Sequence, residues 1–347
     1  MKKIIAFFAA AALLFSLAAC SSSNSDSAGQ SGNPSGNRKA TLLAIQETVT
    51  IDDACEFFVD YTDITDDVLP PQPGSWYSHY EAEDGKVYVD ICVGYKNLST
   101  TEQNADEIIS ATLIYGGKYQ YIGFSMIEEE NRSDFTYSNI TGIAPLCLEY
   151  LHYLFEVPAE VETSGNSLEV LLKIGGSEYR VVLRDEAEAA EAPSGSNAVS
   201  KKNGAVENGE VISIDNVCEF YVDYSSITAK VMPPQPGSWY SYYEADDGKV
   251  YVDFCIAYKN CKSANVGADE VISAKLTYAG KYSYTGFSII EEESRTDFTY
   301  SNITSIAPLS TEYVHYLFEV PEEVENSGKS VEITFTISSH TYTYTVR

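Results

Sequence analysis

The residues best suited to chemistry are carboxylates and arginines that recur at one spacing. Residues 128–134 (EEENRSD) have a counterpart at 291–297 (EEESRTD). Clustered carboxylates offer the oxygen ligands that Ca²⁺ prefers, and paired glutamates serve as acid and base in glycosidases. Charged runs on protein surfaces are usually solvated, with local Arg–carboxylate pairs. We therefore expect a solvated loop here.

The sequence gives weaker evidence for the other candidate metal or catalytic sites. Four aspartates between residues 60 and 67 are only partly kept in the second copy, and their spacing does not match an EF-hand. His152 and His315 lie within expected strands, where a lone histidine is usually structural. The sequence has no His-Glu-x-x-His, no phosphate-binding loop, no dinucleotide fingerprint and no Gly-x-Ser-x-Gly elbow. We expect a protein that is not an enzyme and has no catalytic residue, metal or cofactor.

A proline-rich aromatic loop is the strongest candidate for binding. Residues 70–78 (PPQPGSWYS) recur unchanged at 233–241. Prolines fix φ and remove backbone donors, so this segment should be a stiff, extended loop. Exposed aromatic rings on such a loop can stack on sugars or anchor a peptide. The candidate ligand-binding side chains are Trp76, Tyr77, Tyr80, Trp239, Tyr240 and Tyr243. In the competing interpretation, Trp76 folds back and covers the edge of the domain.

Four of the seven cysteines could form one disulfide bond in each domain. The candidate pairs are Cys55 with Cys92 and Cys218 with Cys255, and each bond could stabilise its domain by about 3–4 kcal/mol. The pattern also argues against them, because Cys55 lies on the apolar side of its strand and Cys92 on the more polar side. The sequence leaves this question open.

A duplication organises the chain. Residues 47–184 recur without a gap as residues 210–347, with most positions identical, and each copy has the length of a single domain. Residues 21–46 and 185–209 separate the copies from the N-terminus and from each other. We expect both segments to be flexible linkers, since they are rich in small and polar residues.

Each copy shows the alternation of a β protein. Apolar residues recur at every second position from Val87 to Tyr95 and from Ile109 to Tyr115. Gly116-Gly117 and Gly175-Gly176 suit hairpin turns, and no long stretch has a helical period. We expect two tandem antiparallel β-sandwich domains of the immunoglobulin-like type. A closed barrel is the alternative.

The first twenty residues have the pattern of an export signal. Lys2 and Lys3 precede an apolar run that is too short to span a bilayer. The ending Leu17-Ala18-Ala19-Cys20 resembles the lipobox of bacterial lipoproteins. That resemblance implies cleavage before Cys20, acylation of its thiol and attachment to the extracellular face of the cytoplasmic membrane, with several acyl chains needed for firm anchoring.

The repeated units also resemble immunoglobulin-like domains of unknown function in Gram-positive surface lipoproteins. The matching residues are 94–97 (GYKN), 152–158 (HYLFEVP) and the terminal hairpin, with repeats at 257–260 (AYKN) and 315–321 (HYLFEVP). The resemblance implies an extracellular, non-enzymatic module and supplies no catalytic residues.

The charge of the chain limits the kinds of partner that it can bind. A formal charge of -29 disfavours nucleic acid and anionic headgroups. We expect a lipid-anchored surface protein whose non-enzymatic domains bind an extracellular glycan, peptide or protein. One alternative is a structural spacer or assembly partner in a surface complex. Another is a surface glycan hydrolase that uses Glu129 and Glu292.

Overall fold

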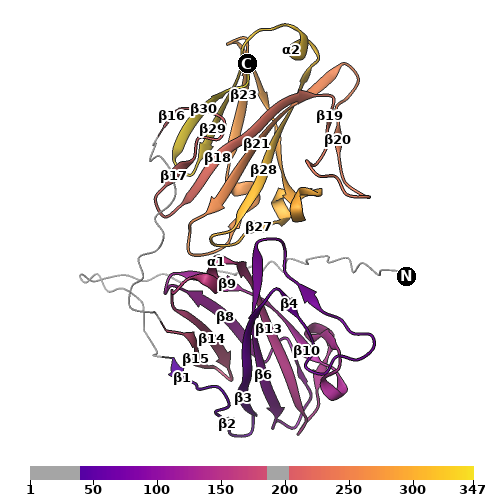
Figure 1. The fold of residues 1–347 in the computed structure, drawn as a ribbon, viewed down its shortest axis with the longest axis vertical. Coiled ribbons are helices and arrows are strands. Elements are labelled where there is room, and N and C mark those ends of the chain that lie inside the picture. The colour runs from indigo at the N-terminus through magenta and orange to yellow at the C-terminus, as the bar shows by residue number, and fades with distance from the viewer. Residues whose placement is uncertain (1–39, 186–202) are drawn as a thin grey trace, which may run out of the picture. The chain divides into compact units, whose positions relative to one another are not determined.

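The computed structural model describes residues 40–185 and 203–347, which form two β-sandwich domains (Figure 1). Each domain pairs a five-stranded sheet with a six-stranded sheet. The expected all-β fold with tandem sandwiches is therefore confirmed. The signal segment, Cys20 and most of both expected linkers lie outside the described residues.

Strand order is the same in both domains. In the first, the five-stranded sheet runs β1 (Thr41–Leu42), β15 (Ser177–Arg184), β14 (Leu168–Ile174), β8 (Ile109–Tyr115) and β9 (Tyr119–Ile122). Its six-stranded sheet runs β2 (Val49–Ile51), β3 (Cys55–Thr65), β6 (Lys86–Asn97), β13 (Leu148–Pro158), β10 (Phe124–Glu128) and β11 (Phe135–Tyr137). Short pairs join β4 (Asp67–Val68) to β5 (Tyr80–Glu81) and β7 (Gln103–Asn104) to β12 (Gly142–Ile143).

The second domain repeats this plan. Its five-stranded sheet runs β16 (Gly204–Val206), β30 (His340–Thr345), β29 (Val331–Ile337), β23 (Ser273–Tyr278) and β24 (Tyr282–Thr285). Its six-stranded sheet runs β17 (Ile212–Ile214), β18 (Cys218–Thr228), β21 (Lys249–Asn260), β28 (Thr311–Pro321), β25 (Phe287–Glu292) and β26 (Asp297–Tyr300). The short pairs are β19 (Lys230–Val231) with β20 (Tyr243–Glu244) and β22 (Val266–Gly267) with β27 (Ser305–Ile306).

Helices are short in the described ranges. Single α-helical turns are α1 (Glu160–Thr163) and α2 (Glu323–Asn326). One-turn 3-10 helices lie at Glu130–Arg132, Ser138–Ile140, Ala268–Glu270, Glu293–Arg295 and Ser301–Ile303. Within residues 40–185 and 203–347, no helix has the length and hydropathy of a membrane span.

Both sandwiches begin within the segments that the sequence assigns to linkers. Strand β1 pairs in parallel with β15, and Leu43 behind it is buried in the first core. In the same way β16 pairs in parallel with β30, and Val206 is buried in the second core. The folded part of each domain therefore starts before Glu47 and before Glu210.

The alternating residues of β6 fill the core as expected, with Val89, Ile91 and Val93 fully buried between the sheets. The opposite face of β6 is buried as well, which alternation alone does not predict. A second apolar cluster forms on that face from Val68, Tyr88, Met126, Phe135 and Leu154. Because Val68 and Phe135 come from outside the central strands, the segments that contain β4 and β11 exclude water from this face.

A bulge in β3 changes which residues reach that outer face. Val59 lies opposite Val93, but Tyr61 lies opposite Cys92, so Asp60 is the extra residue. Tyr61 therefore does not share the inward face of Cys55, contrary to the simple alternation. Its ring lies edge-on to that of His152, with the centroids 5.8 Å apart.

Gly123 marks a second departure from the sequence pattern. At this residue the chain passes from β9 in one sheet to β10 in the other. A Cβ atom on Gly123 would lie 2.1 Å from the carbonyl oxygen of Leu154, so only glycine permits this crossing. Gly286 has the same role in the second domain, 2.2 Å from the oxygen of Leu317.

Candidate functional site

His152 lies at the centre of a buried group of charged side chains on the outer face of the six-stranded sheet. It is fully buried on β13, directly opposite Cys92 on β6. Its Nδ1 lies 2.9 Å from Asp90 Oδ2, and its Nε2 lies 2.9 Å from Glu128 Oε1. An ionised carboxylate only accepts hydrogen bonds, so a ring between two ionised carboxylates donates from both nitrogens, as an imidazolium does.

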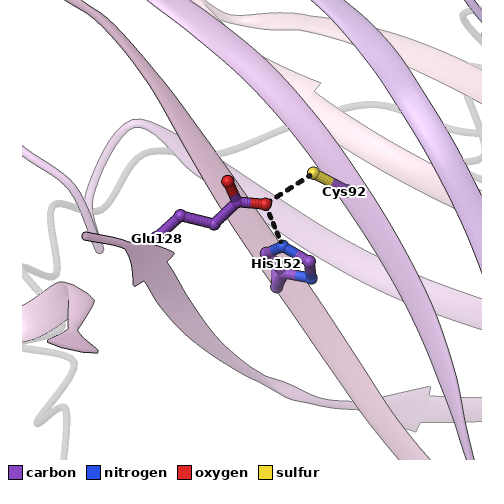
Figure 2. Close-up of side chains that lie close together, drawn as sticks. All are labelled: Cys92, Glu128 and His152. Carbon is purple, nitrogen blue, oxygen red and sulfur yellow. Dashed lines mark hydrogen bonds and ion pairs between the residues drawn. The ribbon is translucent and has the colours of Figure 1, made fainter. Parts of the chain in front are cut away.

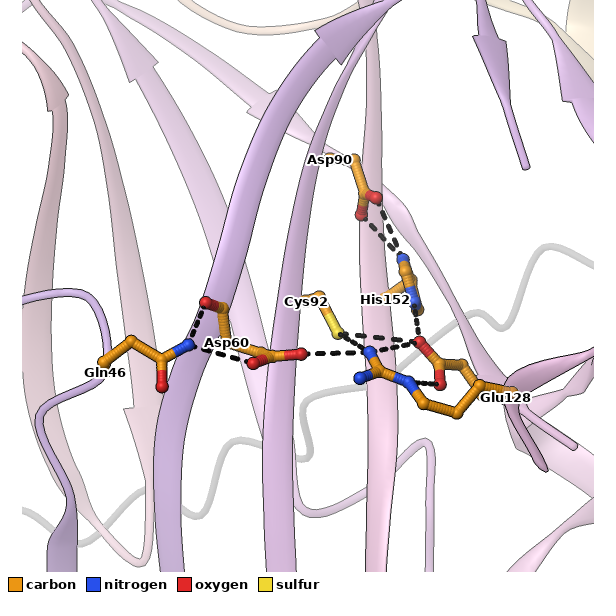
Figure 3. Close-up of polar contacts among 7 residues, drawn as sticks. Gln46, Asp60, Asp90, Cys92, Glu128 and His152 are labelled. Atoms are coloured by element: carbon orange, nitrogen blue, oxygen red, sulfur yellow. Dashed lines mark hydrogen bonds and ion pairs between the residues drawn. The ribbon is translucent and has the colours of Figure 1, made fainter. Parts of the chain in front are cut away.

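Arg132 continues this chain of charges toward the surface, as Figure 3 shows for its partners. Its Nε donates to Glu128 Oε2 at 2.5 Å, and its Nη2 donates to Glu128 Oε1 and to Asp60 Oδ2, each at 2.9 Å. The guanidinium also stacks on Tyr150, 3.9 Å from the ring centroid. We call Asp60, Asp90, Cys92, Glu128, Arg132 and His152 the ionic cluster.

Burial and charge act against each other in the pKa values of the ionic cluster. Burial disfavours the charged imidazolium, but the carboxylates around it raise the pKa of His152 well above its ordinary value. The pKa of Glu128 is lowered, since hydrogen bonds from His152 and Arg132 outweigh its desolvation. Burial raises the pKa of Cys92 to about 11, so its thiol is protonated at neutral pH.

The second domain has the same cluster, as its repeated sequence requires. His315 Nδ1 lies 2.8 Å from Asp253 Oδ1, and Nε2 lies 2.7 Å from Glu291 Oε1. Arg295 donates from Nε to Glu291 Oε2 at 2.5 Å, and from Nη2 to Asp223 Oδ2 at 2.7 Å and to Glu291 Oε1 at 3.0 Å. Burial raises the pKa of Cys255 to about 11.

The expectation of a solvated acidic loop at residues 128–134 is therefore only partly confirmed. The local Arg–carboxylate pair exists between Arg132 and Glu128, but Glu128 is buried, whereas Glu129 is exposed. Sequence reasoning also missed Asp90, which lies in the middle of a long strand. In the sequence, Asp90 stands between the apolar residues Val89 and Ile91. A charged residue in such a strand indicates that a polar partner is buried beside it.

The aromatic loop is exposed in both domains. Residues 71–79 are all exposed, and the side chains of Trp76 and Trp239 are each 92% accessible. The interpretation in which Trp76 folds back over the domain edge is therefore wrong. Tyr77 is 41% exposed, and Tyr240 is half-buried.

The other two candidate tyrosines belong to the domain surface. Tyr80 packs against the outer apolar cluster, with its ring centroid 5.3 Å from that of Phe124. Tyr243 lies 5.4 Å from Phe287 in the same way. The structure therefore brings Trp76 and Tyr77 into a free position and leaves Tyr80 and Tyr243 as partly buried supports.

The aromatic loop and the ionic cluster meet at residues 132–134. Three hydrogen bonds connect them: Gln72 N–H to Arg132 O at 2.9 Å, Gly74 N–H to Ser133 O at 3.2 Å, and Ser78 N–H to Asp134 Oδ1 at 2.6 Å. The same three bonds recur from Gln235, Gly237 and Ser241 to Arg295, Thr296 and Asp297. The proline-rich loop is therefore fastened to the residue that ends the ionic cluster.

Backbone strain accompanies this connection. Asn131 and Arg132 have φ values of 67° and 57°, a conformation that costs a residue other than glycine roughly 1–2 kcal/mol. The equivalent residues Ser294 and Arg295 have φ values of 54° and 64°. Since the Arg132 side chain is fixed by Glu128 and Asp60, its ion pairs help to hold this turn.

The disulfides that the sequence leaves open are not formed. Cys55 lies opposite Asn97, while Cys92 lies opposite Tyr61. Positions 92 and 97 of β6 are separated by roughly 16 Å at the rise of a strand, far beyond the reach of a disulfide. The two thiols also lie on opposite faces of the sheet, because Cys55 belongs to the inner core.

Cys218 and Cys255 are free for the same reason. Cys218 lies opposite Asn260 and belongs to the inner core, whereas Cys255 lies opposite Tyr224.

One part of the ionic cluster has the donor set of a metal site. Figure 2 shows Cys92, Glu128 and His152, whose potential ligand atoms all lie within 4.8 Å of one another. Cys255, Glu291 and His315 form the equivalent group. A thiol, a carboxylate and an imidazole are ligands that zinc accepts.

These observations define an all-β protein with two sandwich domains, each with a buried ionic cluster and an exposed aromatic loop. Neither a protein-family model nor a curated protein matches the sequence.

The solved structures that are similar to part of the chain include two bacterial proteins. One is an uncharacterized β-sandwich protein from Clostridium difficile, with 32% identity over 43% of this chain and 97% of that chain and a TM-score of 0.39. The other is a conserved hypothetical protein from Bacillus anthracis, with 14% identity over 41% of this chain and 95% of that chain and a TM-score of 0.31.

Proposed function

We propose that the protein is a lipid-anchored surface protein whose two domains bind an extracellular ligand through Trp76 and Trp239. The observation that supports this proposal is the 92% exposure of both indoles. A tryptophan can bury roughly 150–250 Å² against a partner. Left in water, the same surface contributes nothing to the stability of the domain, so the loop has its aromatic side chain available for a ligand.

The stiffness of the loop strengthens the proposal. Three prolines between residues 70 and 73 limit its backbone, and hydrogen bonds fasten Gln72, Gly74 and Ser78 to the segment at Arg132. A rigid aromatic side chain loses little conformational entropy when it binds, so more of its contact energy appears as affinity.

The duplication fits weak sites that act together. When two modules are joined in one chain, the second binding event is intramolecular and can increase the overall affinity by factors of roughly 10²–10⁴. A ligand with repeating units, such as a wall glycan, suits this arrangement, and a stacked sugar ring suits an indole face. The proposal therefore favours a glycan over a folded protein partner.

The location of the protein rests on sequence alone. The export signal and the Leu17-Ala18-Ala19-Cys20 ending support acylation at Cys20 and a place on the extracellular face of the cytoplasmic membrane. In that location the domains meet the polymers of the cell wall. The strongly acidic charge of the chain disfavours nucleic acid as a partner.

Co-sedimentation of the purified protein with insoluble peptidoglycan tests the proposal. We expect binding that weakens for Trp76→Ala or Trp239→Ala and is lost in the double variant. Ile140→Ala is a matched control, because Ile140 is a 75% exposed apolar side chain outside the loop. Undiminished binding by the double variant would contradict the proposed role of the loop. Absence of binding by the unmodified protein would favour the spacer or assembly partner.

A further inference from the structure

We propose that Cys92, Glu128 and His152 bind one divalent metal ion of the zinc class. The equivalent residues of the second domain, Cys255, Glu291 and His315, bind a second ion. This inference goes beyond ligand binding by the aromatic loop and does not depend on it.

The three donors come from three neighbouring strands of one sheet. His152 on β13 lies opposite Cys92 on β6, and Glu128 ends the next strand, β10. Glu128 Oε1 is 2.9 Å from His152 Nε2 and 3.9 Å from Cys92 Sγ. Two ligands of a tetrahedral zinc ion lie roughly 3–4 Å apart. Only small side-chain movements would therefore place all three atoms around one ion.

The imidazole ring is already held in the orientation that a metal ligand needs. Asp90 Oδ1 and Oδ2 lie 3.0 and 2.9 Å from Nδ1, so Nδ1 keeps its hydrogen and Nε2 is the atom directed at Glu128 and Cys92. A carboxylate that accepts from the far nitrogen of a ligating histidine is a usual companion of zinc. Asp253 holds His315 in the same way.

The charge of the ionic cluster permits an exchange of protons for metal. Without metal, Cys92 is a thiol and His152 has hydrogens on both nitrogens. A divalent ion that bonds to Sγ and Nε2 displaces one proton from each of them, while Glu128 is already a carboxylate. The net charge of the buried group is the same before and after, so binding adds no new charge to a buried site.

Arg132 contacts two of the ligand atoms in the metal-free protein. Its Nη2 donates to Glu128 Oε1 at 2.9 Å and lies 4.0 Å from Cys92 Sγ. Metal binding therefore requires Nη2 to give up these two contacts and keep its hydrogen bond to Asp60, while Nε keeps its hydrogen bond to Glu128 Oε2. Glu128 can then give Oε1 to the ion and keep Oε2 on Arg132. This second bond would fix the carboxylate that completes the site.

The test is a titration of the chelator-treated full chain with Zn²⁺, and with Co²⁺ as a spectroscopic probe. We expect two ions per chain and release of about two protons per ion, measured with a pH indicator. Co²⁺ should give a thiolate-to-metal absorption band. The paired variant Cys255→Ser with His315→Gln should bind one ion per chain. Asp90→Asn with Asp253→Asn should weaken binding by roughly 10–100-fold.

Cys147→Ser is the matched control, because Cys147 is an exposed thiol outside the ionic cluster. This variant should bind both ions as the unmodified chain does. Failure of the unmodified chain to bind Zn²⁺ and Co²⁺ would overturn the proposal without any variant. Binding without a thiolate band, or binding that persists after Cys92→Ser with Cys255→Ser, would assign the ions to surface carboxylates and would also overturn it.

Discussion

The backbone N–H of Gln72 donates to the carbonyl oxygen of Arg132 at 2.9 Å, while the side chain of Arg132 reaches Glu128 inside the domain. One residue thus joins the exposed aromatic loop to the buried charges. The same relationship holds between Gln235 and Arg295, at 3.0 Å. Arg132 therefore connects the loop that carries Trp76 to Glu128.

Removal of the two indoles should leave the domains stable. Trp76→Ala and Trp239→Ala should each change the free energy of unfolding by less than about 0.5 kcal/mol, because both side chains are almost fully exposed. Urea denaturation measures this change. Phe57→Ala, at a fully buried position, is the contrast and should cost about 3–5 kcal/mol. A large loss of stability in the tryptophan variants would show that the loop packs on the domain.

Removal of the arginine should loosen the loop as well as destabilise the domain. Arg132→Leu leaves Glu128 buried without one of its cations, and we expect a loss of about 3 kcal/mol, the low end for a broken buried pair because Arg132 is partly exposed. Hydrogen exchange at the amides of Gln72 and Gly74 should become faster.

Arg180→Leu is the control for that variant, because its 2.9 Å pair with Glu169 is more exposed than the pair of Arg132 with Glu128, at 43% and 24% against 27% and 2% of the side chains. It should cost at most about 1 kcal/mol and leave exchange in the loop unchanged. Equal effects of the two substitutions on the loop amides would contradict the connection through Arg132.

The protonated histidines should make the stability of the metal-free protein depend on pH. The folded-state pKa of His152 lies well above that of the unfolded chain, about 6.5. The folded state therefore binds more protons above that pH, and stability should fall as pH rises from about 6.5 through the folded pKa. Glu128 has a lowered pKa, so its contribution should be lost as pH falls below about 4.5.

Denaturation in the presence of a chelator between pH 6 and 9 measures the alkaline part of this effect. His152→Gln with His315→Gln should flatten the slope in that range, whatever the absolute stability of the variant. An unmodified protein with the same slope as this variant would show that the histidines are not held protonated.

Thiol labelling should distinguish free cysteines from disulfides. Cys55, Cys92, Cys218 and Cys255 are buried free thiols, and Cys147 is exposed. In the native protein, Cys147 should react first, and the four buried thiols should react only after unfolding without reductant. Mass spectrometry counts the labels. Failure of the buried thiols to react in denaturant would indicate the disulfides that the strand register excludes.

The sequence predicts the sandwich well because alternation along β6 and β14 has the period of a strand. It predicts the outer face poorly, because burial there depends on Val68 and Phe135, which arrive from distant segments. The bulge at Asp60 leaves no mark in the alternation, yet it turns Tyr61 toward His152.

The ionic cluster is equally hard to predict from the sequence. Its residues come from four strands and one turn, so no local spacing unites Asp90, Glu128 and His152. The aromatic loop was easier to find, since its prolines and Trp76 are adjacent in the sequence. The sequence does not predict the exposure of this loop, because a short aromatic segment can either project into solvent or fold back on the domain.

The most direct test of the proposed function uses the two tryptophans themselves, since Trp76 and Trp239 are the only ones in the chain. Their emission reports on the aromatic loops alone. We would measure acrylamide quenching of the purified protein with and without saturating soluble peptidoglycan fragments. The proposal predicts strong quenching of the free protein, and a blue shift with marked protection when the fragments bind. Fragments that bind but leave emission and quenching unchanged would place the binding surface elsewhere and contradict the proposal.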